Sequence, residues 1–186
     1  GSRALADRLV EKLHRDRFND GDKAFIESLP FFFLATADAE GRPDCSFKGG
    51  APGFAHVARP NLLVFPDYDG NGMFKSLGNL KANAQVGLLF IAMDEKPKRL
   101  RVNGRAEVVR DDPLLARFPG GQLLVRVTPE HIFPNCPRYI HQMKMKSPSA
   151  YVPQAGCEPV EPAWKGFEDF KPVVPPRAPT TPLARQ

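Results

Sequence analysis

The 186-residue sequence is poor in cysteine and has no long apolar run, and both features exclude classes of protein. Cys45, Cys136 and Cys157 lie far apart and form no Cys-x-x-Cys pair, which excludes a zinc knuckle and a thioredoxin-type motif. No apolar stretch approaches the roughly 20 residues of a membrane helix, and no signal peptide is recognisable. We therefore expect a cytoplasmic protein that does not enter a membrane.

Several signatures of nucleotide and metal binding are also missing. No Gly-x-x-x-x-Gly-Lys-Ser/Thr loop occurs, which excludes a P-loop, and no Gly-x-Gly-x-x-Gly follows a strand, which disfavours a Rossmann dinucleotide site. The four histidines do not have the spacing of metal ligands, so we expect no metal site.

Positive charge is modest and concentrated in one stretch. The formal net charge is +5, and six Lys or Arg residues fall between Lys96 and Arg110. A nucleic-acid surface would interleave such a stripe with exposed aromatic side chains, whereas this stretch alternates like a pair of strands. The alternative is a solvated sheet edge, where charge discourages aggregation. We predict no nucleic-acid partner.

The composition is that of an ordinary globular domain, with 42% hydrophobic and 25% charged residues. The 20 prolines are unevenly distributed, however, and many follow Pro129. We predict a domain over residues 1–150 and a Pro-rich extension over residues 151–186, extended or disordered and without a core of its own. Trp164 and Phe167 are the extension's candidates for docking on the body or on a partner subunit.

Hydrophobic periodicity predicts a mainly β fold with flanking helices. Apolar residues recur at helical spacing over residues 3–18, and a second helix is expected from Asp20 to just before Pro30. Short helices are also expected from Gly70–Gly72 through Leu80 and from Pro113. Strands are expected over residues 31–37, 43–48, 54–58, 62–65, 86–92, 98–109 and 121–128. Because few helices separate these strands, we predict a six- to seven-stranded antiparallel barrel rather than a parallel sheet.

The stretch between Cys45 and Leu89 carries the clearest binding chemistry. One strand ends in a lysine and two glycines, so its backbone can approach a ligand closely. A second strand brings Phe65–Tyr68 to the same rim, and a Gly- and Asn-rich turn opens a helix whose free N–H groups can receive a phosphate. Alternatively, the lysines are solvent charges and the turn is a plain connection. The side chains available to an anion are those of Lys48, Asn71, Lys75 and Ser76.

The order of these motifs resembles the pyridoxamine 5′-phosphate oxidase-related proteins. The series continues with Asn-x-x-Val-Gly-Leu-Leu-Phe over residues 83–90 and Val-x-Gly-Arg-Ala-Glu over residues 102–107. The resemblance covers about residues 20–145 and depends on the ordered series more than on any one motif. Proteins of this family are split β-barrel homodimers that bind one flavin mononucleotide (FMN) at each of two intersubunit sites. The resemblance therefore implies a homodimeric split barrel with FMN as its cofactor.

The resemblance also implies a set of cofactor-binding residues. Those along the flavin and its phosphate tail would be Ser46, Phe47, Lys48 and Gly49. Those flanking the ring and the ribityl chain would be Phe65, Pro66, Asp67 and Tyr68. The phosphate and pyrimidine side would be held by Asn71, Phe74, Lys75 and Ser76, with Asn79 and Leu80 behind them. The second subunit would contribute Arg99, Arg101 and Asn103, which share one strand face.

The sequence departs from the true oxidases at three places. Asp44 and Cys45 begin a strand that basic residues bracket in the oxidases, and Met73 and Phe74 stand where a basic pair falls. The oxidases' Trp followed by Arg-x-His is not evident, so pyridoxamine 5′-phosphate is not supported as the substrate.

Residues 133–141 resemble a subgroup of uncharacterised flavin-binding relatives. That resemblance implies that Arg138 and Tyr139 are buried near the flavin and shape a substrate pocket. Alternatively, Tyr139 and Ile140 lie in a dimer core and Arg138 makes a structural ion pair.

These inferences predict an FMN-dependent oxidoreductase of unknown substrate, in which the flavin supplies the redox chemistry and no catalytic residue is assigned. One alternative is a non-catalytic flavin-binding sensor or storage dimer. Another is a split barrel that binds a deazaflavin, or haem through His56. We expect Lys48→Ala to release the cofactor and Lys165→Ala, in the tail, to leave it bound.

Overall fold

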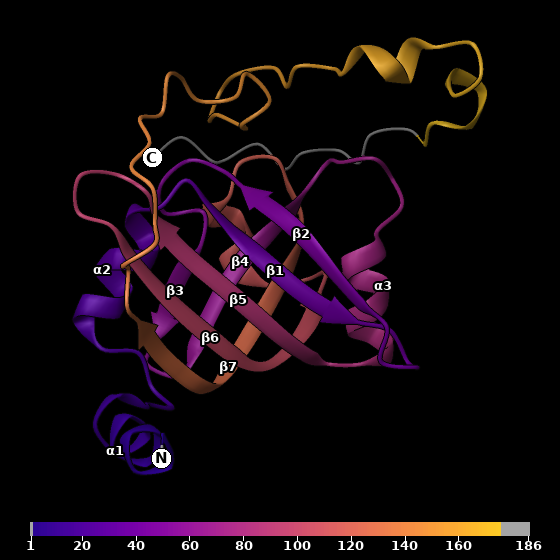
Figure 1. The fold of residues 1–186 in the computed structure, drawn as a ribbon. Helices are drawn as coiled ribbons and strands as arrows, with labels where there is room; N and C mark the ends of the chain where they lie inside the picture. The colour runs from indigo at the N-terminus through magenta and orange to yellow at the C-terminus, as the bar shows by residue number, and fades with distance from the viewer. Residues whose placement is uncertain (1, 176–186) are drawn as a thin grey trace.

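The computed structural model, which describes residues 2–175, is built around one antiparallel sheet of seven strands (Figure 1). The strand order is β2-β1-β5-β6-β7-β4-β3. The strands are β1 (Phe31–Ala37), β2 (Pro43–Gly49), β3 (His56–Arg59), β4 (Leu62–Tyr68), β5 (Gln85–Ala92), β6 (Lys98–Val109) and β7 (Gly121–Asn135). The helices are α1 (Arg3–Leu13), α2 (Asp20–Ser28) and α3 (Lys75–Ala82), with 3-10 turns η1 (Pro113–Arg117), η2 (Ala163–Gly166) and η3 (Lys171–Val173). The predicted mainly β, antiparallel fold is confirmed.

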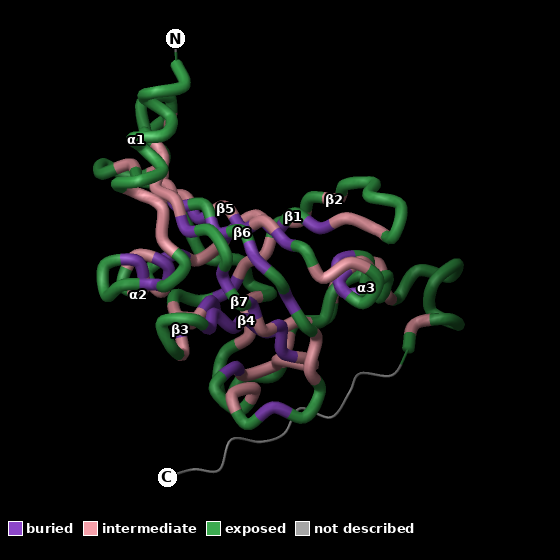
Figure 2. Tube along the Cα trace, turned by 90° about the horizontal axis from the view of Figure 1, so that it is seen from below, coloured by how far each residue is buried: buried purple, intermediate pink, exposed green. Residues whose placement is uncertain are grey.

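The sheet curls around a single main core and stays open between its two outer strands, as in a split barrel. Alternation along β1 turns Phe32 inward, where its ring lies 5.0–5.6 Å from the rings of Phe54, Phe65 and Phe90. Burial of each such ring contributes about 1.5–3 kcal/mol. Buried segments follow the strands in Figure 2, whereas α1 is exposed. The barrel core is thus dominated by aromatic rings from separate strands.

The opening of the barrel follows from the shortness of β3. This strand pairs only with Leu62–Val64 of β4, so the second half of β4 has no β3 neighbour. Strand β2 forms the opposite outer strand and, within the described residues, pairs with β1 alone. The rim between β2 and the end of β4 is therefore free to receive a ligand.

The N-terminal segment differs from the predicted helix over residues 3–18. Helix α1 ends at Leu13, because Arg15 exchanges two backbone hydrogen bonds with Ile132 of β7. No residue of α1 is buried, so its apolar stripe does not pack on the body. Helix α2 then begins in a capping box formed by Asn19 and Asp22.

Four further expectations are corrected. The basic stretch of β6 is not a sheet edge, because β6 pairs with β5 on one side and β7 on the other. Strand β7 continues to Asn135, beyond the predicted end at residue 128. Strand β3 begins at His56 rather than at residue 54, and α3 begins at Lys75 rather than near Gly70.

Among the described residues, no helix is long and apolar enough to cross a membrane.

Candidate functional site

A pocket of about 850 Å³ lies at the open rim of the barrel, within the size range of roughly 300–1,000 Å³ common for small-molecule sites. Its walls come from β2, from the end of β4, from the loop that leads into α3 and from the first turn of α3. The start of β7 and the C-terminal segment complete it. The body residues that line it are Asp44, Ser46, Phe47, Lys48, Asp67, Tyr68, Asp69, Gly70, Asn71, Gly72, Met73, Phe74, Lys75, Ser76, Leu77, Arg110, Gln122 and Leu123.

Positive charge in this pocket is only partly neutralised. The Lys75 ammonium lies 3.1 Å from the Asp44 carboxylate, so this lysine already has a counter-ion. Lys48 and Arg110 also line the pocket, and neither makes an ion pair with another residue of the part that the structure describes. An anion entering the pocket would therefore find two cations without a direct counter-ion.

Asp67 is the most perturbed group in the pocket. Its Oδ2 is buried and has no hydrogen-bond partner among the described residues. Burial raises the pKa of this carboxyl to about 6, and nearby Lys48 opposes that rise. Burial likewise raises the pKa of the neighbouring Tyr68 to about 12, so its hydroxyl stays protonated. Asp67 thus offers a bound molecule an acceptor oxygen that the protein leaves unused.

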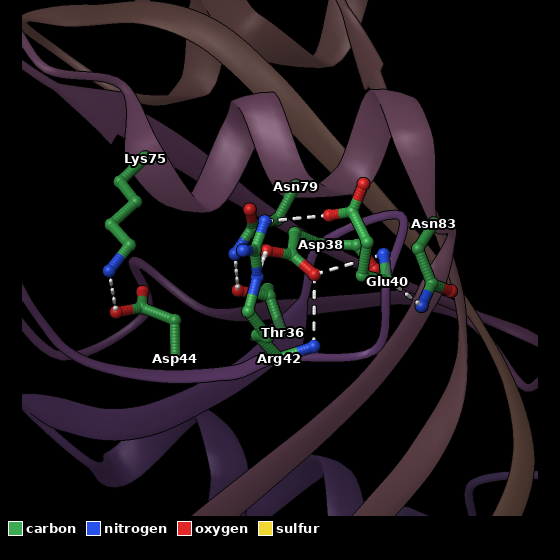
Figure 3. A network of polar contacts seen from close by, with 8 residues as sticks. All are labelled: Thr36, Asp38, Glu40, Arg42, Asp44, Lys75, Asn79 and Asn83. Carbon is green, nitrogen blue, oxygen red and sulfur yellow. Dashed lines mark hydrogen bonds and ion pairs between the residues drawn. The ribbon is translucent and has the colours of Figure 1, made fainter.

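Polar contacts hold α3 against the hairpin of β1 and β2 (Figure 3). The Asn79 amide donates to Thr36 Oγ1 at 3.0 Å, and the Asn83 amide donates to the backbone carbonyl of Asp38 at 3.4 Å. Near the pocket, the hydroxyls of Ser46 and Ser76 share a hydrogen bond of 2.7 Å. The serine contact fixes the first turn of α3 beside β2, and the two asparagine contacts hold the end of the helix beside β1 and the turn that follows it. Asn79 therefore contacts β1 and does not line the pocket.

The turn into α3 contains a strained residue. Phe74 caps the helix with φ of 49°, a left-handed conformation that is uncommon for a bulky residue. Asn71 does not open the helix, which begins at Lys75, and its side chain accepts from the backbone N–H of Met73 at 3.1 Å. The helix N–H groups nearest the pocket are those of Lys75–Leu77 instead. Strain of this kind is found at ligand sites, where surrounding structure enforces it.

The pocket brings together about half of the residues implied by the resemblance. Those that line it are Ser46, Phe47, Lys48, Asp67, Tyr68, Asn71, Phe74, Lys75 and Ser76. Gly49 and Pro66 flank lining residues, whereas the side chains of Phe65 and Leu80 are in the hydrophobic core and do not face a ligand. Arg99, Arg101 and Asn103 lie on the outer face of β6 and do not line the pocket of this subunit.

The segment after β7 differs from the expectation of buried residues near the flavin. Tyr139 is 85% exposed and Arg138 is also exposed, so neither is buried within one subunit. Hydrogen bonds from Arg138, above all from its backbone N–H, hold the pKa of the Cys136 thiol below its ordinary value, and Arg99 adds to the effect.

Sequence reasoning named Trp164 and Phe167 as candidates for docking on the body, but it did not place the C-terminal segment in the site. Trp164, Lys165, Phe170, Val173, Val174 and Pro175 line the same pocket. The Lys165 ammonium lies 2.5 Å from the Asp69 carboxylate, so Lys165 is not the remote control residue that the sequence suggested. An aromatic residue in a Pro-rich tail was the available signal, but its docking place depends on the folded body.

The structure also bears on two other kinds of site, a haem site at His56 and a metal site. His56, the residue considered as a haem ligand, does not line the pocket, and its Nδ1 lies 2.7 Å from Glu27 Oε1. Within residues 2–175, no group of three or more His, Cys, Asp or Glu side chains is arranged to hold a metal.

Comparison with known proteins gives one family and several similar structures. The sequence profile described as pyridoxamine 5′-phosphate oxidase matches residues 18–148. A candidate pyridoxamine 5′-phosphate oxidase from Lactobacillus delbrueckii is 23% identical, with a TM-score of 0.50 over 64% of this chain and 95% of that one. HupZ from Group A Streptococcus is 18% identical, with a TM-score of 0.50 over 63% and 93% of the two chains. A conserved hypothetical protein from Mycobacterium tuberculosis is 16% identical, with a TM-score of 0.50 over 75% and 98%. The structural superpositions establish a shared fold, and at these identities the likeness extends no further. No curated protein sequence matches.

Proposed function

Since the chain belongs to the pyridoxamine 5′-phosphate oxidase family, we propose that it binds FMN in the pocket at the rim of the barrel and acts as a flavin-dependent oxidoreductase. The observation that carries the proposal is the combination of Lys48 and Arg110, two cations without an ion pair in the described chain, with the unpaired oxygen of Asp67. A riboflavin phosphate offers the complement of this set, because it has an anionic end and several hydroxyl and N–H donors.

The residues present fit the cofactor in chemical type. Lys48 and Arg110 would hold the phosphate, together with the N–H groups at the start of α3. Asp67 Oδ2 would accept a hydrogen bond from a ribityl hydroxyl or from a ring N–H. Phe47, which is 63% exposed, offers an apolar face to the ring. When bound, the flavin supplies hydride and electron transfer, and the protein binds it, orients it and excludes water.

Catalysis of a particular oxidation also requires a substrate. The Trp followed by Arg-x-His with which the oxidases bind the substrate phosphate is not evident in this sequence, which argues against pyridoxamine 5′-phosphate. The proposed enzyme therefore acts on a different electron donor or acceptor.

We assign the cofactor site to a homodimer. Arg99, Arg101 and Asn103 face outward on β6, away from the pocket of their own subunit, and in the proposed dimer they would serve the partner's site. The exposed Tyr139 would likewise be covered by a second subunit.

Titration of the flavin-free protein with FMN and with riboflavin tests this proposal. We expect FMN to bind in the micromolar range or tighter and riboflavin to bind at least tenfold more weakly, because only FMN has the phosphate that the cations would hold. Equal affinities would contradict the proposed phosphate site. A Soret band after addition of haem, without FMN binding, would show that the protein binds haem in place of the flavin.

Reduction by a nicotinamide and reoxidation by oxygen then test catalysis. A bound flavin that cycles at useful rates supports the oxidoreductase. A bound flavin that neither donor reduces nor oxygen reoxidises would make the protein a flavin-binding sensor or store.

A further inference from the structure

The chain beyond β7 runs along the body, and the last residues that the structure describes, residues 173–175, line the pocket. The backbone N–H of Met143 donates to the carbonyl of Met93 at 2.5 Å, and Pro153 packs beside Gly120, where an added Cβ would lie 2.8 Å from the proline ring. Lys165 then reaches Asp69 at 2.5 Å. In Figure 1 this part of the chain, orange to yellow, runs along one end of the barrel.

The contact at Lys165 is unusual for a tail. The Lys165 side chain is only 13% exposed and that of Asp69 is 25% exposed, whereas lysine is rarely buried unless it is paired. The Lys165 ammonium also lies 6.0 Å from the centre of the Trp164 ring, which meets Phe170 edge-on at 5.9 Å. Trp164, Lys165 and Phe170 therefore form one small cluster, and all three line the pocket.

The walls of the pocket differ in how firmly they are held. Strands β2 and β4 and helix α3 are fixed by backbone ladders and by the contacts of α3 with the hairpin. Residues 164–175, here called the C-terminal strap, contain only 3-10 turns, and Phe167, Phe170 and Val173 of the strap are exposed. A segment with so few buried contacts opens at a much lower free energy than the sheet does.

We propose that the C-terminal strap is a movable wall of the cofactor pocket, latched by the ion pair of Lys165 with Asp69, that limits access of solvent and of electron partners to the bound flavin. The inference rests on the proposed function, since it concerns the same pocket. Small reactants would pass while the latch is closed, and larger ones would need it to open. Trp164 and Phe170 are then positions that determine specificity.

The sole tryptophan of the chain makes the strap directly observable, because all tryptophan fluorescence comes from Trp164. We would compare the full-length wild type with Lys165→Met, which keeps an unbranched side chain, one heavy atom shorter, and removes its charge. The matched control is Lys171→Met, in the same strap, because Lys171 is exposed and makes no ion pair within residues 2–175. Iodide quenching of Trp164 is measured without flavin, and iodide quenching of the flavin is measured after loading with FMN.

Breaking a partly exposed ion pair weakens the latch by enough to raise the open population about two- to fivefold. We therefore expect Lys165→Met to raise both quenching constants by about that factor, with FMN still bound and with Lys171→Met like the wild type. Equal quenching of Trp164 in all three proteins would overturn the latch. A change at Trp164 without a change at the flavin would show that the strap docks but does not cover the ligand, which also overturns the proposal. If the wild type binds no FMN, the proposed function fails, and the flavin-free measurement still decides whether Lys165 holds the strap.

Discussion

Asp67 lies where burial disfavours the charged carboxylate. This loss of stability indicates that the residue serves a purpose other than holding the fold together. A group with a raised pKa and an unpaired buried oxygen lowers the stability of the empty protein, so the fold itself gains nothing from it. Its position in the pocket, next to Lys48, gives it a different use. Groups of this kind cluster at functional sites, and Asp67 is the residue that most clearly marks this one.

Replacement of Asp67 by asparagine should stabilise the empty protein at neutral pH. The pKa is raised from 3.8 to about 6 in the folded state, so the folded protein holds the proton more tightly than the unfolded chain between these values. The free energy of unfolding therefore falls as the pH rises through this window and stays lower above it. We expect Asp67→Asn to raise this free energy by about 1–3 kcal/mol at pH 8, and the gain to disappear towards pH 4. Urea unfolding at the two pH values measures it.

The exposed Asp16 provides the control for that series. Asp16→Asn should leave the pH dependence of unfolding as in the wild type, because this side chain is exposed. A gain for Asp67→Asn that persists unchanged at pH 4 would contradict the assigned titration.

Lys48→Ala should lower the affinity for FMN without unfolding the protein. A charge-assisted bond to a phosphate contributes about 1.5–3 kcal/mol, which corresponds to a loss of affinity of about 10- to 150-fold. Lys48 is half-buried and makes no ion pair in the described chain, so its removal should cost little stability. The control is Lys96→Ala, an exposed lysine in the loop between β5 and β6. Fluorescence titration with FMN measures both, and equal affinity in the two variants would remove Lys48 from the phosphate site.

The sequence predicted Lys48 and Asp67 because each belongs to a local motif at a strand end. It did not predict Arg110 or Lys165, because nothing local distinguishes them from other surface cations. Only the folding of β6 and of the tail towards the same rim brings these two residues to the pocket.

At the scale of elements, β7 shows why the end of a strand is harder to predict from the sequence than its body. The body of β7 was predicted from its apolar alternation, but Pro129 and Pro134 argue against a strand beyond residue 128. In the structure, β7 pairs with β4 only as far as Val127, and the register against β6 shifts at Gly104, opposite Pro129. Ile132 exchanges its backbone bonds with Arg15, so strand alternation turns the nitrogen of Pro134 away from β6 as well. The strand pairing therefore explains why both prolines are tolerated, and this pairing cannot be read from the sequence.

Gly104→Ala should disrupt this irregularity in the sheet. A Cβ at this position would lie 2.1 Å from the carbonyl oxygen of Thr128, and a backbone atom cannot move aside cheaply. We expect a loss of about 3 kcal/mol or more in the free energy of unfolding. At Gly87 the nearest atom to an added Cβ is the flexible Asn103 Nδ2 at 3.3 Å, so Gly87→Ala should cost less than about 1 kcal/mol. Thermal unfolding compares the two, and similar losses would contradict the role assigned to the register shift.

At the scale of the molecule, the sheet presents an apolar outer face as well as an apolar core. Along β1, Phe31 and Phe33 alternate with buried residues and so point outward, and their rings lie 5.3 and 6.0 Å from the ring of Phe47. Leu89 of β5 is opposite Phe33 on one side and opposite Arg101 on the other. Phe47 is well exposed, and a face of this composition is typical of a surface that another subunit covers. The same face carries the β6 residues proposed to serve a partner's cofactor.

Leu89→Arg should therefore separate the subunits and weaken FMN binding together. Leu88 and Phe90 supply the core at this point, so an outward arginine at position 89 leaves the barrel intact, but a charge cannot be buried in an apolar interface without a partner. We expect the wild type to sediment as a dimer, the variant as a monomer, and the affinity of the variant for FMN to fall by at least about tenfold. Asp16→Arg, which adds positive charge at an exposed position, should do neither. A monomeric wild type would refute the dimer, and a monomeric variant with unchanged affinity would show that one subunit holds the flavin alone.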